Sequence, residues 1–205
     1  MDNLLTPNTS DSDHLWSFAC EVYSNSSVAE ACLALQDRYD VDVPLLLFCC
    51  WAGRDYGELP KELLQQALSF TKAWSSNTTK PLRAIRRDMK TSYSPQWPVS
   101  DTDWSDLREQ VKRAELASEK LMLDGLSRLI LDSSYAAGAE HSGIVAAVLN
   151  IKYCFQFSSA SNSTQGNGMP YDNDEDANEG GAKVYLIDIL SIAFNLERSE
   201  IAPLL

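Results

Sequence analysis

The feature that most constrains the fold of this chain is a short apolar run that ends at Trp51. The residues from Leu45 to Trp51 read LLLFCCW, so a helix built from them is apolar on every face. Asp42 can cap such a helix, and Pro44 fits its first turn because the N–H that proline lacks has no partner there. We therefore predict that residues 43–52 form a central helix that the rest of the core covers.

Apolar residues elsewhere recur at the three- and four-residue spacing of amphipathic helices, as Leu15, Phe18 and Val22 do. Ser27 and Glu30 predict a capping box, and residues 77–79 predict a turn. We expect further helices at 14–23, from 27, from 60 to 74, at 81–89, at 102–131 and at 144–155. The sequence thus predicts an all-α fold, in which residues 14–157 form a single helical-bundle-like domain around the buried central helix.

Both ends of the predicted domain are flanked by segments with few apolar residues. Residues 1–13 contain no basic residue, and residues 158–181 consist mainly of Ser, Asn, Gly and acidic residues. We expect both segments to be disordered, the second as an acidic linker, because they bury too little apolar surface to offset the entropy of ordering. Residues 182–205 predict a C-terminal amphipathic helix that docks on its own domain or on a partner.

The charge balance disfavours polyanionic partners. The 205 residues include 17 Lys and Arg against 29 Asp and Glu, a formal net charge of -12, which repels nucleic acid at long range. The longest apolar run, residues 44–53, has about half of the roughly 20 residues that cross a bilayer. Residues 1–13 lack the basic start and apolar stretch of a secretory signal. We expect a cytoplasmic protein without a membrane span, and the sequence predicts no oligomeric state.

No residue pattern points to catalysis, a metal or a cofactor. His14 and His141 have no second ligand at helical spacing, and the phosphate-loop, dinucleotide and zinc-protease motifs are absent from the sequence. Cys49 and Cys50 point to different sides of a helix, which disfavours a metal or redox pair. We expect all five cysteines to be reduced core residues: Cys20, Cys32, Cys49, Cys50 and Cys154. These features favour a non-enzymatic protein.

The most unusual local feature is a row of basic residues on the predicted helix 81–89. This basic stripe consists of Arg83, Arg86, Arg87 and Lys90. It is consistent with a solvated face that forms ion pairs within the chain, to acids such as Asp37, Asp42 or Glu58. We expect at least one of Asp37, Asp40 and Asp42 to contact it.

Two functional interpretations of the basic stripe remain. It is a docking surface for an acidic partner protein, or for this chain's own acidic segment 172–179. Alternatively it is an anion or RNA-phosphate site, at which Trp74 can stack on a base.

The preferred function is a non-enzymatic interaction or regulatory module that offers the basic stripe to a partner. The alternative is an enzyme or a small-molecule or anion-binding protein, with a pocket between helices that uses Trp51, Trp74, Arg83 and Arg87. A pocket that converges on a buried Arg or Asp without a partner would favour the alternative, whereas a filled core would favour the module.

Four segments carry a resemblance to a known family. They are residues 15–19 (LWSFA), 31–37 (ACLALQD), 42–49 (DVPLLLFC) and 81–87 (PLRAIRR). Together they resemble an uncharacterised, all-helical family of proteobacterial proteins over roughly residues 15–128. The resemblance implies a bacterial cytosolic protein and no particular activity.

Overall fold

The computed structural model describes residues 9–133, 143–162 and 175–205. Within these three ranges all regular secondary structure is helical and none is strand, which confirms the predicted all-α fold. The elements are α1 (Thr9–Tyr23), α2 (Ser26–Tyr39), α3 (Val43–Asp55), α4 (Lys61–Trp74), the π-helical turn η1 (Ser75–Thr79), α5 (Lys80–Asp88), α6 (Asp101–Leu131), α7 (Ile144–Asn162), α8 (Glu175–Phe194) and α9 (Arg198–Ile201). None of these helices is long and apolar enough to cross a membrane.

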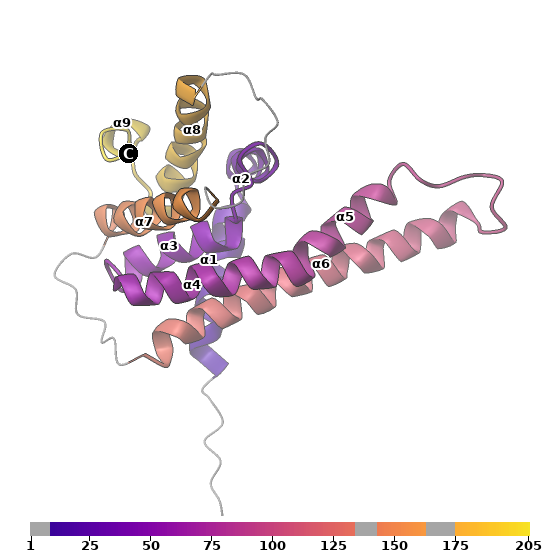
Figure 1. Ribbon diagram of the computed structural model, residues 1–205, viewed down its shortest axis with the longest axis horizontal. Helices are drawn as coiled ribbons and strands as arrows, with labels where there is room; N and C mark the ends of the chain where they lie inside the picture. Colours follow the sequence, from indigo (N-terminus) through magenta and orange to yellow (C-terminus); the bar gives the residue numbers. More distant parts are fainter. Residues whose placement is uncertain (1–8, 134–142, 163–174) are drawn as a thin grey trace, which may run out of the picture.

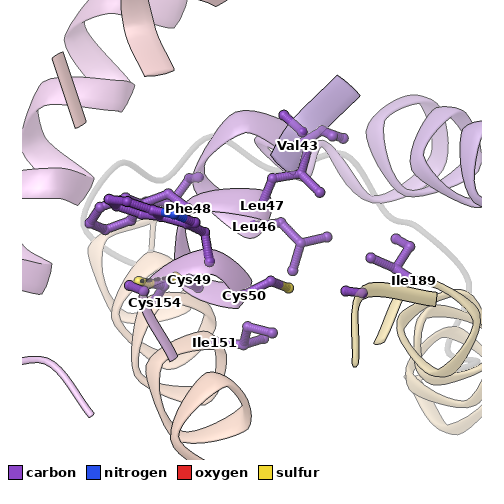
Figure 2. Close-up of a cluster of buried hydrophobic side chains, with 14 of the residues drawn as sticks. Val43, Leu46, Leu47, Phe48, Cys49, Cys50, Ile151, Cys154 and Ile189 are labelled. Carbon is purple, nitrogen blue, oxygen red and sulfur yellow. Dashed lines mark hydrogen bonds between the residues drawn. The ribbon is translucent and has the colours of Figure 1, made fainter. Parts of the chain in front are cut away.

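Helix α3 is the centre of the core, as predicted. Every residue from Leu45 to Gly53 is buried, and the side chain of Phe48 is fully enclosed. The helices α1, α6, α7 and α8 all pack against α3, with α7 making the most extensive contact. Figure 2 shows Ile151 of α7 and Ile189 of α8 beside the side chains of α3. An all-round apolar helix is thus covered on all sides, as its sequence requires.

The crossing of α3 and α7 depends on a glycine. A Cβ atom on Gly53 would lie 2.3 Å from the backbone nitrogen of Ala147, so the two backbones could not approach this closely with a larger residue. The Gly143 N–H also donates a 2.7 Å hydrogen bond to the Gly53 carbonyl. This close contact fixes the position of the N-terminal end of α7 on the central helix.

A buried asparagine fixes the loop between α3 and α4. The Asn150 side chain, fully buried on α7, accepts a 2.9 Å hydrogen bond from the Leu59 N–H and donates a 3.2 Å bond to the Gly57 carbonyl. Gly57 has a φ of 93°, which favours glycine. Both loop groups therefore have partners although they lie away from water.

Of the two helix caps predicted for α2 and α3, one is confirmed and the other is wrong. Asp42 caps α3 as predicted, because its Oδ1 accepts a 3.1 Å hydrogen bond from the Leu45 N–H. The predicted capping box of Ser27 and Glu30 is wrong: α2 starts one residue earlier, and Asn25 caps it by accepting a 3.0 Å bond from the Ser27 N–H. An asparagine caps a helix as well as a serine does, so the earlier residue took the position.

The predicted turn at residues 77–79 is also wrong, because α4, η1 and α5 follow one another as a single rod (Figure 1). Pro81 explains the wider π-helical turn between them. Proline has no N–H, and its ring clashes with the carbonyl four residues earlier in an ordinary helix. One wider turn relieves that clash while the chain continues in the same direction.

Helix α5 and the N-terminal half of α6 form an arm that extends away from the body (Figure 1). The arm's tip is held by an aromatic cluster: Trp104 lies against Tyr93 and Trp97, with ring centroids 6.1 and 5.4 Å away. The indole N–H of Trp104 also donates a 3.0 Å hydrogen bond to the Met89 carbonyl. The loop between the two helices is therefore anchored to the start of α6.

The C-terminal helix packs on the chain's own body. α8 contacts α2 most extensively, and Ile189 and Leu190 are fully buried. The Tyr185 hydroxyl accepts a 3.1 Å bond from Arg38 of α2. α8 begins at Glu175, inside the segment predicted as a linker, and α1 begins at Thr9, inside the segment predicted as a disordered N-terminus. The predictions for residues 1–8 and 163–174 lie outside the described residues.

Candidate functional site

Two residues of the basic stripe face α6 rather than solvent. The Arg83 Nε donates a 3.0 Å hydrogen bond to Glu115, and its Nη2 donates a 2.8 Å bond to Glu119. Arg86 also pairs with Glu115, and its own backbone carbonyl accepts a 3.3 Å bond from Arg108. The side chains of Arg83 and Glu115 are only 12% and 9% exposed. These charges are therefore committed to holding α5 on α6.

The Glu115 carboxylate is ionised because of its two arginine partners. Burial alone would raise the pKa of Glu115, but the hydrogen bonds from Arg86 and Arg83 outweigh it and hold that pKa below its usual value. The same contact raises the pKa of Arg86. Glu119 differs, because burial raises its pKa despite the nearby charge of Arg83. The buried part of the basic stripe is thus a charge-compensated seam inside the arm.

The rest of the basic stripe is more exposed. Arg87 forms an ion pair with Asp37 of α2, in which both side chains are about half exposed. This pair confirms the expectation that one of the three acids near the α2–α3 junction contacts the stripe. Lys90 is exposed, and the described residues include no ion pair to it. The chain's own acidic segment, residues 172–179, lies outside the residues whose side chains the structure describes.

Trp74 is held against α6 and is not free to stack on a base. Its indole N–H donates to the backbone carbonyl and to the hydroxyl of Ser118, each at 3.1 Å. The Ser118 hydroxyl also forms a 2.7 Å bond with Thr79 of η1. Phe70 packs beside the indole, with the ring centroids 5.9 Å apart. Trp74 therefore positions the π-helical turn over α6.

Sequence reasoning missed Glu115 and Glu119, the acids that bind the stripe. They lie one helical turn apart on α6, which matches the spacing of Arg83 and Arg86 or Arg87 on the helix that faces them. This paired spacing was the available signal. It does not by itself tell which two helices pack together.

A cavity of about 520 Å³ lies beside the basic stripe, between the α2–α3 junction and the α4–η1–α5 rod. Its apolar lining comes from α3, α4, α6 and α7, and includes Leu46, Leu68, Met122 and Ile151. Its polar lining comes from the junction and the rod: Gln36, Tyr39, Asp40, Asp42, Ser69, Thr71, Lys72, Ser75, Ser76, Thr79, Lys80 and Arg83. The cavity thus joins an apolar wall to a lining in which twelve of the 22 residues are polar.

Asp42 is the acidic group of the cavity that lacks an ion pair. Its carboxylate accepts hydrogen bonds from the Leu45 N–H and from Ser75. Within the described residues no Lys or Arg lies within ion-pair distance of it. Burial raises the pKa of Asp42, against the lowering effect of those bonds and of the charges of Arg83 and Lys80.

The two cations nearest to Asp42 are bound to other acids. Lys80 contacts both carboxylate oxygens of Asp40 at 2.8 Å, and Arg83 is bound to Glu115 and Glu119. Asp40 has a φ of 50°, so the chain turns sharply just before the α3 cap. This turn places one acid on the rim and the next, Asp42, farther inside.

Two thiols form part of the cavity wall. The Sγ atoms of Cys49 and Cys154 lie 3.6 Å apart. A dashed line marks this contact in Figure 2. The contact with Cys154, together with burial, raises the pKa of the Cys49 thiol. Burial raises the pKa of Cys50 to about 12. None of the five cysteines forms a disulfide, but Cys20 is exposed, so the expectation that all five lie in the core is wrong for that residue.

The other residues considered for a pocket or a metal lie elsewhere. Trp51 is enclosed in the core at 1% exposure, and its indole N–H has no hydrogen-bond partner among the described residues. Of the four residues expected to line a pocket, Arg83 does so, while Trp51, Trp74 and Arg87 do not. The part of the chain that the structure describes contains no group of three or more His, Cys, Asp or Glu that could hold a metal ion.

A comparison with protein families finds one matching family. Residues 14–126, more than half of the chain, match the family described as "Protein of unknown function (DUF2390)". The chain belongs to this family. The resemblance expected over roughly residues 15–128 is thereby confirmed, and the match ends inside α6. It therefore includes the arm and most of the cavity wall, but not Ile151 or Cys154. A search of curated proteins and a search of solved structures each gave no match.

Proposed function

We propose that this protein is a non-enzymatic binding module that holds a small molecule in the cavity between the α2–α3 junction and the α4–η1–α5 rod. The single observation that carries the proposal is the cavity itself, which combines an apolar wall with a carboxylate, Asp42, that has no ion-pair partner. Its volume of about 520 Å³ lies within the range of about 300–1,000 Å³ that is usual for ligand sites.

The contacts of the basic stripe support this choice over the docking function that the sequence favours. A docking surface needs charges that a partner can reach, but Arg83 and Arg86 are bound to Glu115 inside the arm. A partner would have to break these ion pairs before it could bind the two arginines. Breaking a buried ion pair costs more free energy than a new, exposed ion pair with the partner would supply.

Binding of Nile red, an uncharged apolar dye, tests the proposal. We expect the wild-type protein to bind the dye saturably, with one site per chain. Ser69 is exposed on α4 and lines the cavity, so Ser69→Trp should block the site without disturbing the core. Ala73→Trp is the matched control, since Ala73 is also exposed on α4 but does not line the cavity. Equal dye binding by both variants would refute the proposal.

A second candidate function is protein docking at the tip of the arm. The observation that favours it is the exposure of Trp97 and Val99, each 43% exposed, close in sequence to the exposed Lys90. Aromatic residues next to basic ones suit an acidic partner protein. In affinity purification at low salt, the tagged wild-type protein should then retain a partner protein. The variants Trp97→Ala and Lys90→Glu should each fail to retain it. Retention by both variants would exclude the tip.

The cytosolic location expected from the sequence is part of the proposal. Five cysteines without a disulfide suit a reducing compartment.

A further inference from the structure

We propose that the ligand of the cavity is an organic ammonium ion with an apolar body, and that the Asp42 carboxylate is its counter-ion. This inference rests on the proposed function, since it assigns a chemical class to the small molecule that the cavity binds. It follows from three features of the cavity: the unused acceptor capacity of Asp42, the prior commitment of the nearby cations, and the apolar wall.

The first feature is the acceptor capacity of Asp42. An ionised carboxylate accepts about four hydrogen bonds, and Asp42 receives one from the Leu45 N–H and one from Ser75. Asp42 is partly buried, so its carboxylate has lost part of its hydration, and no cation lies within ion-pair distance of it in the described residues. A bound ammonium group would supply both a charge and donors.

The second feature is that the neighbouring cations are already bound. Lys80 uses its ammonium on both oxygens of Asp40, and Arg83 bridges Glu115 and Glu119. An anionic ligand would have to displace Glu115 and Glu119 from Arg83, whereas the exposed Lys80–Asp40 pair would resist it only weakly. Lys72 is the remaining basic residue of the lining, and it lies exposed on the last turn of α4. The buried part of the cavity therefore favours a positive ligand.

The third feature is the apolar wall, which determines that the part of the ligand outside its ammonium group is apolar. Leu46, Leu68, Met122 and Ile151 line the cavity with at most 8% of each residue exposed, and Tyr39 and Pro44 of the same lining are partly exposed. A small hydrophilic cation such as ammonium itself would leave this surface unfilled. An aromatic or aliphatic amine would cover the apolar wall with its body and bring its charge to Asp42.

Three probes of similar shape and different charge test the inference. Tryptamine is a cation at neutral pH, tryptophol is its uncharged alcohol analogue, and indoleacetate is an anion. Their affinities for the full-length protein are measured by isothermal titration calorimetry and by displacement of Nile red. We expect tryptamine to bind about 10- to 100-fold more tightly than tryptophol, which is the range expected for a charge-assisted hydrogen bond in a buried site.

Asp42→Asn separates the charge from the helix cap. Asparagine caps helices as well as aspartate does, so the variant keeps the hydrogen bond to the Leu45 N–H and should fold normally. We expect it to bind tryptamine no more tightly than tryptophol, while its affinity for tryptophol is unchanged. The control is Asp88→Asn, which removes one negative charge from an exposed residue outside the cavity and should leave all three affinities as they are.

The outcomes distinguish this inference from the proposed function. Equal binding of tryptamine and tryptophol, tightest binding of indoleacetate, or an unchanged tryptamine affinity in Asp42→Asn would each overturn the ammonium assignment and leave the cavity as a binding site. If none of the three probes binds and Nile red is not bound either, the proposed function falls together with the inference.

Discussion

Replacing Glu115 by glutamine should release α5 from α6 while the core stays folded. α5 has no buried residue of its own, so its attachment depends on the ion pairs of Arg83 and Arg86 with Glu115. Removing one member of a buried ion pair costs about 3–5 kcal/mol. Glutamine keeps the shape of the side chain, and Glu119 still binds Arg83, so we expect the lower end, about 3 kcal/mol.

Native-state hydrogen exchange measures this loss helix by helix. A loss of about 3 kcal/mol in the opening free energy speeds amide exchange about 100-fold, since about 1.4 kcal/mol corresponds to a factor of ten. Exchange in α5 should rise by that factor, and exchange in α3 should not change. The control is Glu109→Gln on the same helix: Glu109 pairs with Lys112 at 3.6 Å, and both are largely exposed. That pair is worth less than about 1 kcal/mol.

Two results would refute the reasoning. If α5 exchanges at the same rate in Glu115→Gln and Glu109→Gln, the buried ion pairs do not hold the arm. If exchange rises equally in α5 and α3, the arm does not open separately from the core, and the ion pairs contribute to global stability instead.

Further predictions concern the core and the pH dependence. Gly53→Ala should lower the melting temperature by about 6–12 °C. The added Cβ would lie 2.3 Å from the Ala147 nitrogen and would force α7 away from α3, at a cost of about 3 kcal/mol. An unchanged melting curve would contradict this prediction. Asn150→Ala should lower the free energy of unfolding by about 3 kcal/mol in urea titrations, because it leaves two buried loop groups without partners; a loss below about 1 kcal/mol would show that water replaces the side chain. The stabilisation by Glu115 should be complete above the usual glutamate pKa of 4.5 and should be lost as the pH falls below it, because the pKa of Glu115 is lowered in the folded protein. The difference in α5 exchange between wild type and Glu115→Gln should therefore shrink at pH values below 4.5, and a constant difference would contradict the assignment.

The helices and the central position of α3 could be predicted because each follows from local spacing. Leu46 and Phe48 are buried for the reason that the sequence indicates: their helix offers no polar face to water. The cap at Asp42 is equally local, since it needs only a side-chain oxygen and an N–H three residues later. Such features depend on no other part of the chain.

The orientation of the basic stripe could not be predicted in the same way. A row of arginines ordinarily faces solvent, yet Arg83 and Arg86 face α6 because Glu115 offers a carboxylate that is about thirty residues away in sequence. The apolar Ile85 consequently lies 49% exposed. Hydrophobic periodicity identifies the face of a helix that differs from the others, but the packing partner decides which face is covered.

The π-helical turn was missed because residues 77–79, Asn-Thr-Thr, have the composition of a turn. The same composition satisfies a wider helical turn once Thr79 is bonded to Ser118, which a local reading of the sequence does not show. Of the four residues predicted to line a pocket between helices, only Arg83 lines the cavity, for a related reason. The lining comes from segments that lie far apart in the sequence, from Gln36 to Cys154.

The cavity exists because two local requirements meet at the same place. Asp42 must cap α3, and this brings a carboxylate to the end of the central helix. Pro81 is incompatible with an ordinary helical turn, so the rod opposite Asp42 widens into η1 and contributes hydroxyl-bearing residues there. A cap could be supplied by an uncharged residue, and a straight rod could be built without proline. The charged cap and the widened turn are therefore the two features on which the proposed ligand site depends.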